Sequence, residues 1–108
     1  MGFTFDTTTP IGRIRLLIGD KEQTGALFSD EELDALLALE NGNVYLAAAN
    51  ALDIIATDQV MVLKVIKLVG SLETDGAKVA VAIREQASIL RGTAMSGNDI
   101  AVSVFGVV

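Results

Sequence analysis

A helix start encoded between Phe28 and Leu33 constrains the fold of this chain more than any other local pattern. Ser29 stands at an N-cap position and Glu32 follows three residues later, which is the spacing of a capping box. Phe28 and Leu33 flank the box at the spacing of a hydrophobic staple. The acidic run 30–32 complements the positive end of a helix dipole, so capping is favoured over a cation site. The pattern predicts a helix over residues 29–40 that ends at Asn41-Gly42.

Similar start and stop signals divide most of the remaining sequence into helices. Thr9-Pro10 is typical of an N-cap followed by a first-turn proline, and Gly19 ends the helix that follows. Asn43 caps a further helix, and Thr74-Asp75-Gly76 precedes the last one. We therefore expect an all-α fold, a four-helix domain with helices near residues 10–18, 29–40, 43–62 and 75–92.

Apolar residues recur in these four segments at the spacing of one buried helix face. A single core is expected to form where the four faces meet. Its predicted members are Leu17, Leu33, Leu36, Leu37, Leu52, Ile55, Ile83 and Leu90.

The stretch from Val60 to Val69 is ambiguous. Its β-branched content favours a strand, whereas helical spacing places Lys64 and Lys67 together at i and i+3. We expect helix to about Leu63 and then an extended passage through Glu73. A short β element near 64–73 is the alternative to a loop.

Small residues line one side of the segment 43–58. They allow close approach of another helix, which suits either a central helix or a contact between subunits. Arg13 and Arg15 are expected to lie away from the apolar side of helix 10–18. The candidate subunit-interface residues are Arg13, Arg15, Ala47, Ala48, Ala51, Lys64 and Lys67.

The C-terminal segment is apolar on both alternating faces and carries no charge after Asp99. We expect a lead at 1–9, a helical domain at 10–92, a flexible hinge at 93–98 and an apolar arm at 99–108. An unpaired apolar strand is an aggregation hazard, so the arm is expected to add to another chain. The alternatives are that it folds back over its own helices or pairs with residues 61–69. The arm residues expected to bind a partner are Ile100, Val102, Val104, Phe105, Val107 and Val108.

The residue types that are absent narrow the chemistry. The chain has no His and no Cys, which removes the usual zinc ligands, Ser-His and Cys-His pairs, thiol chemistry and disulfides. No glycine-rich phosphate loop is present either. We expect no catalytic residues, no cofactor and no metal.

The overall balance of residues predicts association with other proteins. Apolar residues make up 51% of 108 residues, and a chain of this size buries only about two-thirds of its unfolded surface. The net charge of −6 does not suggest a general nucleic-acid binder. The longest uncharged run, 41–52, is shorter than the roughly 20 residues of a membrane span, and residues 1–9 lack the features of a secretory signal. We expect synthesis in the cytoplasm, no membrane contact and a homo-oligomer or a permanent partner.

Four segments, in their order and spacing, carry a resemblance. The first is Thr9-Pro10-Ile11-Gly12-Arg13-Ile14-Arg15-Leu16-Leu17-Ile18-Gly19-Asp20. The second is Leu27-Phe28-Ser29-Asp30-Glu31-Glu32-Leu33, and the third is the Ala-rich stretch 43–58. The fourth is Gly70-Ser71-Leu72-Glu73-Thr74-Asp75, which precedes a helix ending near Leu90-Arg91. Over residues 9–92 the chain resembles the short head-to-tail adaptor (connector) proteins of tailed bacteriophages and prophages.

The resemblance implies a structural virion protein. Such adaptors form a ring, commonly of twelve copies, beneath the portal protein in the neck between capsid and tail. The ring contacts neighbouring adaptor subunits and the next tail or neck component, and DNA passes through its channel without sequence-specific binding. Family members often place a C-terminal arm against the portal, a role that residues 98–108 fit. Any binding of DNA or of the portal through Arg13 and Arg15 is expected to be modest.

Two other classes stay open from the residues alone. One is a small non-viral helical scaffold or regulatory module that binds a partner helix in an Ala-lined groove. The other, weaker, is a small hydrolase-like or metal-carboxylate enzyme. The mass in solution separates the ring from the scaffold module only in part, because adaptors can stay monomeric until they meet the portal.

Overall fold

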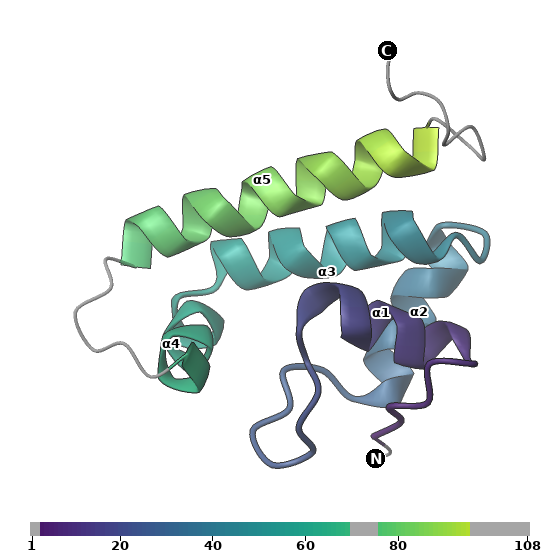
Figure 1. Ribbon diagram of the computed structural model, residues 1–108, viewed down its shortest axis with the longest axis horizontal. Coiled ribbons are helices and arrows are strands. Elements are labelled where there is room, and N and C mark those ends of the chain that lie inside the picture. Colours follow the sequence, from purple (N-terminus) through teal and green to yellow (C-terminus); the bar gives the residue numbers. More distant parts are fainter. Residues whose placement is uncertain (1–2, 70–75, 96–108) are drawn as a thin grey trace.

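All secondary structure in the described part of the chain is helical. The computed structural model describes residues 3–69 and 76–95 (Figure 1). Its helices are α1 (Pro10–Ile18), α2 (Asp30–Leu39), α3 (Val44–Thr57), α4 (Gln59–Val69) and α5 (Gly76–Met95). The all-α prediction is confirmed over these residues, but with five helices where four were expected.

Local capping fixes the first two helices, as predicted. The Thr9 side chain accepts a hydrogen bond from the Gly12 backbone N–H, and Gly19 closes α1 in the left-handed conformation at φ 79°. At α2 the capping box is complete. The Glu32 backbone N–H donates to the Ser29 hydroxyl at 3.2 Å, and the Ser29 backbone N–H donates to the Glu32 carboxylate at 2.8 Å.

The prediction of one helix over 43–62 is wrong. The chain leaves the helical conformation at Asp58 (φ −113°, ψ 111°) and turns by 99° between α3 and residues 59–67 of α4. The cause is a local cap, because the Asp58 carboxylate accepts hydrogen bonds from the backbone N–H groups of Val60 (2.9 Å) and Met61 (3.3 Å).

Residues 64–69 are helical, so the extended passage and the β alternative are wrong for that part of 64–73. The helical spacing of Val62 and Ile66, both buried, outweighs the β-branched content of the stretch. Residues 70–73 lie outside the described part of the chain.

Helix α5 extends to Met95, three residues into the segment expected to be a hinge. Gly92 does not break it, and the Thr93 hydroxyl donates to the carbonyl of Ile89, four residues earlier, at 3.1 Å. Residues 96–98 of the expected hinge lie outside the described residues.

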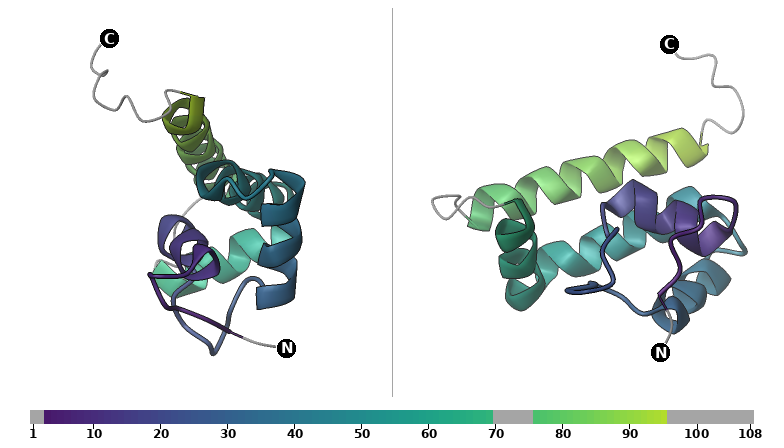
Figure 2. Two further views of the ribbon diagram at one scale, coloured as in Figure 1. Left: turned by 90° about the vertical axis from the view of Figure 1, so that its right-hand side faces the viewer. Right: turned by 60° about the horizontal axis from the view of Figure 1, so that its bottom comes forward.

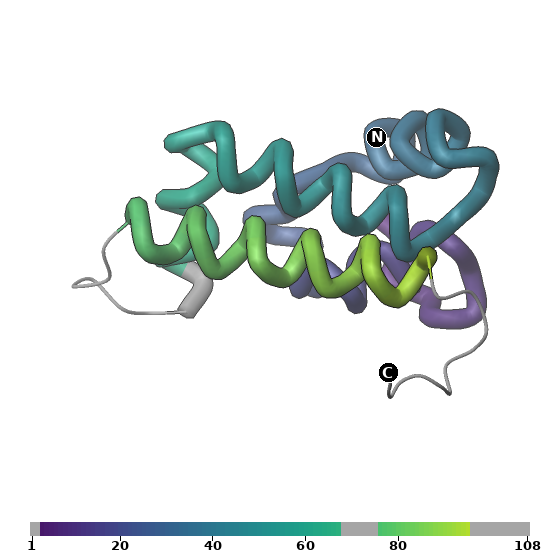
Figure 3. Tube along the Cα trace, turned by 90° about the horizontal axis from the view of Figure 1, so that it is seen from above, coloured from purple at the N-terminus to yellow at the C-terminus, as the bar shows by residue number. Residues whose placement is uncertain are grey.

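The helices stack around α3, which contacts all four others. Helix α5 lies along α3 in the opposite direction, whereas α1 and α2 cover the other side of α3 (Figures 1 and 2). Viewed from above, α3 and α5 run side by side over most of their lengths (Figure 3). The Arg91 guanidinium fastens α5 to α3 through Asn50 and Asp53.

The core forms where the predicted faces meet. Leu33, Leu52, Ile55 and Leu90 are buried, and the other four predicted members pack against them while partly exposed. The cluster also includes Leu27, Phe28 and alanines of α3, which the list of predicted core members did not contain. Several of these alanines are fully buried, because α3 is enclosed by its neighbours.

The lead packs closely on the first helix at Gly12. A Cβ built on Gly12 would stand 1.9 Å from the carbonyl oxygen of Asp6. The same carbonyl accepts the backbone N–H of Thr9 at 2.9 Å and its hydroxyl at 2.7 Å. Only glycine leaves room for this turn against α1, so the lead is held as part of the domain.

Candidate interaction surface

The predicted partner-binding arm lies outside the described residues. This applies to Ile100, Val102, Val104, Phe105, Val107 and Val108. The remaining candidates divide into buried and exposed groups, and only the exposed group can contact another chain without rearrangement.

Arg15 is in the interior, which corrects its assignment to a subunit contact. Its side chain is fully buried, and its guanidinium donates to Asp20 at 2.7 Å and to Asp30 at 3.0 Å. The guanidinium also stacks over the Phe3 ring, 4.0 Å from its centroid. Arg15 follows Ile11 by four residues and precedes Ile18 by three, so it lies on the apolar face rather than away from it.

Two carboxylates complete the cluster around Arg15. Asp20 accepts the backbone N–H groups of Leu27 (2.9 Å) and Phe28 (3.2 Å), which ties the loop before α2 to α1. Asp30 accepts the backbone N–H of Thr4 at 2.8 Å and its hydroxyl at 2.6 Å. Burial raises the pKa of Asp30, but these bonds and Arg15 outweigh it and hold the pKa below its usual value. The cluster therefore joins lead, α1, loop and α2, and its role is structural.

Ala47, Ala48 and Ala51 are also buried within a single chain, which corrects their assignment to a subunit contact. They lie on α3, and the fully buried Ala87 of α5 belongs to the same core cluster. Of the two roles expected for the small residues of α3, the structure supports that of a central helix.

Arg13, Lys64 and Lys67 are exposed and stay available to a partner. The Arg13 guanidinium donates to the carbonyl of Thr7 at 3.0 Å. The two lysines form no hydrogen bond or ion pair with the described part of the chain. They share the outer face of α4 with Val60 and Leu63, which are 63% and 58% exposed.

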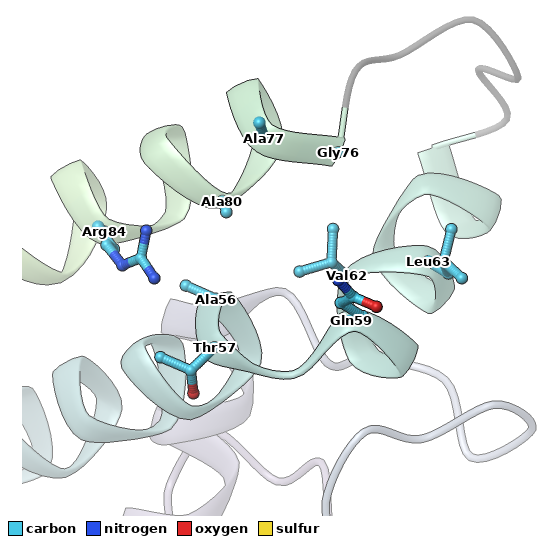
Figure 4. A pocket seen from close by; sticks show the side chains of 9 residues that line it. All are labelled: Ala56, Thr57, Gln59, Val62, Leu63, Gly76, Ala77, Ala80 and Arg84. Carbon is cyan, nitrogen blue, oxygen red and sulfur yellow. The ribbon is translucent and has the colours of Figure 1, made fainter.

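A groove of about 550 Å³ opens where the end of α3, the start of α4 and the start of α5 meet (Figure 4). Its walls are mostly small or apolar, with Ala56, Ala80 and Val62 among them. Thr57 and Gln59 add polar groups, and Arg84 lies at one end. The Arg84 guanidinium makes no ion pair with the described residues. Such a groove accepts apolar side chains and, at Arg84, a carboxylate, and it contains no pair of groups suited to nucleophilic catalysis.

Large apolar side chains remain exposed on every helix. They include Leu16 on α1, Leu39 on α2 and Ile54 on α3. The others are Tyr45, Val60, Leu63, Val81, Ile89 and Met95 on the helices, and Phe5 in the lead.

Charge is segregated along the molecule. Residues 3–57 contain nine acidic and three basic side chains, whereas α4 and α5 together contain five basic side chains and one acidic. Helix α4, which contains Lys64 and Lys67, and helix α2, which contains four acidic residues, lie near opposite ends of α3 (Figure 1). Opposite charges at two separate ends favour contacts between complementary surfaces.

Within residues 3–69 and 76–95, no group of three or more His, Cys, Asp or Glu side chains could hold a metal ion. No single helix in the same residues is long and apolar enough to cross a membrane. Only α3 together with 59–67 meets that criterion, across the 99° bend. Most of the apolar residues of α3 are buried against other helices.

Comparison of this chain with protein-family models, with curated proteins and with solved structures finds no match.

Proposed function

We propose that this chain is a structural subunit of the neck of a tailed-bacteriophage particle, a head-to-tail adaptor that forms a ring beneath the portal. The ring, commonly of twelve copies in the family that residues 9–92 resemble, extends the DNA channel and joins the next tail or neck component. The chain acts by binding proteins, without catalysis or a cofactor. Its place is the virion, after synthesis in the host cytoplasm.

The observation that carries the proposal is the surplus of exposed apolar side chains around a complete core. The core already joins all five helices, yet each helix keeps at least one large apolar residue at the surface. Contiguous exposed apolar patches mark sites of protein contact. A ring subunit needs two flanks, an upper contact and a lower contact, which suits apolar residues spread over several faces.

The segments of the resemblance that the structure describes also help to build the fold. Thr9 and Ser29 cap helices, Gly12 admits the lead, and Arg15 pairs with Asp20. Shared spacing of such residues supports a shared fold, because each has a distinct structural task. The ring, the contact with the portal and the DNA channel are implied by the family resemblance, and they are what we propose for this chain.

The acidic balance of the chain supports passage of DNA without retention. A channel through which DNA slides must not neutralise many phosphates, because each neutralised phosphate strengthens binding. Nine acidic side chains in residues 3–57 and a net charge of −6 meet that requirement.

The test is attachment to purified portal rings of the same phage, with the full chain and with residues 99–108 deleted. We expect the full chain to co-sediment with the portal rings and the truncated chain to remain in the supernatant. Circular dichroism should show that the truncated chain keeps its helical content. Val104→Asp should also prevent attachment, since a buried unpaired charge is costly, whereas Ser96→Asp, outside the arm, should not. Failure of the full chain to bind portal would contradict the proposal, and undiminished binding by the truncated chain would contradict the role of the arm.

The groove favours a second candidate function, that of a helical scaffold or regulatory module outside a virion. Its alanine walls and Arg84 suit an apolar segment of a partner that carries a carboxylate. Ala80→Trp would fill the groove. Loss of a partner through this change, combined with no binding to portal rings, would favour the scaffold module over the adaptor.

A further inference from the structure

The outer face of α2 carries acidic residues followed by small ones. Glu31, Asp34, Ala35 and Ala38 are all exposed and fall at i, i+3, i+4 and i+7, so they form one stripe along the helix. We call these four residues the α2 stripe. Leu39, 74% exposed, lies beside its C-terminal end. The stripe is therefore acidic toward the start of α2 and apolar toward its end.

The outer face of α4 has the reverse order. Val60, Leu63, Lys64 and Lys67 are exposed and fall at the same four helical positions, and we call them the α4 stripe. It is apolar toward the start of α4 and basic toward its end. Val62 and Ile66, on the opposite side of the helix, are buried and hold α4 in place.

The two stripes complement each other when the helices run antiparallel. Asp34 then faces Lys64, Glu31 faces Lys67, and the alanines face Val60 and Leu63. The small side chains of Ala35 and Ala38 leave room for the larger Val60 and Leu63 between the helices. Opposite charges set the register and orientation of such a contact, while the apolar ends supply buried area.

The stripes cannot meet within one chain. Helix α2 makes no contact with α4, and the two helices lie at opposite ends of the long axis of the molecule (Figure 1). A contact between two different surfaces of identical chains is heterologous, so it repeats from copy to copy and closes into a ring when the rotation allows.

We propose that the α4 stripe of one copy packs antiparallel on the α2 stripe of the next copy, as the head-to-tail contact between subunits. This inference deepens the proposed function. The closing of the contact into a neck ring rests on that proposed function. The contact itself needs only a second copy of this chain. Lys64 and Lys67, which have no partner among residues 3–69 and 76–95, gain one in the neighbour.

Disulfide trapping tests the contact directly, since the chain has no native cysteine. Ala38→Cys in one population and Val60→Cys in another are mixed at high concentration and oxidised. We expect a cross-linked dimer of the two variants on a non-reducing gel. The matched control replaces Val60→Cys by Ser88→Cys, which is exposed on α5, and should give little cross-linked dimer.

Charge reversal then tests whether the stripes provide the register. Lys64→Glu added to the Val60→Cys chain, or Asp34→Lys added to the Ala38→Cys chain, should each reduce the cross-link by about tenfold, as like charges meet across the contact. Mixing the two reversed chains should restore it, because the opposite charges again face each other. Circular dichroism checks that each variant keeps its helices.

Three results would overturn the inference: no cross-link between the two cysteine variants, equal cross-linking of the Ser88→Cys control, or a cross-link that charge reversal leaves unchanged. The experiment contains no portal protein, so it can fail while the chain still binds portal rings. Conversely, a chain that cross-links as expected but does not bind portal would contradict the neck adaptor and leave the head-to-tail contact standing.

Discussion

The Arg15 side chain shows how a single residue organises the N-terminal half of the molecule. Its fully buried guanidinium has carboxylates of Asp20 and Asp30 on one side and the Phe3 ring on another. We predict that Arg15→Met, which keeps an unbranched stem but removes the guanidinium group, lowers the free energy of unfolding by about 3–5 kcal/mol, because Asp20 is left buried without its partner. Urea unfolding followed by circular dichroism measures the loss.

Arg13→Met is the matched control for that change. Arg13 lies two residues away on the same helix but is exposed, so its replacement should alter stability by less than about 0.5 kcal/mol. Equal effects of the two substitutions would show that the cluster around Arg15 does not hold the fold together.

The Asp30 carboxyl makes stability depend on pH. Its pKa is lower in the folded chain than usual, since hydrogen bonds from Thr4 and Arg15 outweigh the effect of burial. Such a group stabilises the fold above its unfolded pKa of about 3.9, and this contribution is lost as pH falls through the folded value. We predict that Asp30→Asn is less stable than the native chain at neutral pH and that the gap narrows below about pH 4.

Urea melts at a series of pH values measure this gap. Asp34→Asn, exposed on the same helix, should show no comparable gap at neutral pH. A difference between native and Asp30→Asn chains that stays constant down to the lowest pH would contradict the proposed ionic role of Asp30.

The close packing of the lead against Gly12 of α1 leads to a prediction about stability. Gly12→Ala should destabilise the domain by about 1–3 kcal/mol, because the new methyl group collides with the backbone of Asp6 and must displace the lead. Gly92→Ala, in the interior of α5 with open space around the added methyl, should instead stabilise by about 0.5–1 kcal/mol. Thermal melts compare the two, and a neutral Gly12→Ala would show that the lead is not packed on α1.

The sequence did not predict the burial of Arg15, for a physical reason. The charge of a buried arginine must be compensated, and the compensating Asp20 and Asp30 are brought to Arg15 by the loop and by α2. Its spacing from Ile11 and Ile18 carried a signal of burial, which the charge of the side chain masked.

At the scale of the elements, capping residues decide where helices begin and end. We predict that Asp58→Ala costs about 1 kcal/mol, because α4 loses the carboxylate that accepts the N–H groups of Val60 and Met61. Asp58→Asn, which keeps an accepting oxygen, should retain most of the stability. Equal losses from both substitutions in urea melts would show that the cap does not set the break between α3 and α4.

Signals confined to a few neighbouring residues were predicted well. The ends of α1 and the capping box of α2 depend on side chains within one turn, so the sequence alone was enough to find them. The break at Asp58 was missed because apolar residues continue at helical spacing on both sides of it. Strand propensity misled the reading of 64–69, where packing of Val62 and Ile66 favours the helix.

For the whole molecule, the candidate contacts follow from what the fold leaves uncovered. Lys64 and Lys67 were identified from the sequence and are exposed, whereas Ala47, Ala48 and Ala51 turned out to be inside. Small residues fit both a central helix and a subunit contact, so only the placement of α5 and α1 against α3 separates these roles. The stripes of α2 and α4 were recognised as a contact between copies only because the structure places the two helices at opposite ends of the molecule.

The mass of the complex formed with purified portal rings shows whether the chain acts as a neck adaptor. Native mass spectrometry of the mixture should show portal rings that gain a fixed number of copies of the 11.3 kDa chain, matching the symmetry of the portal. The Lys64→Glu chain alone should bind in fewer copies per portal ring. A mixture of the Lys64→Glu chain with the Asp34→Lys chain should restore the number. Portal rings that stay at their own mass, with the chain free beside them, would contradict the account of this protein as a neck adaptor.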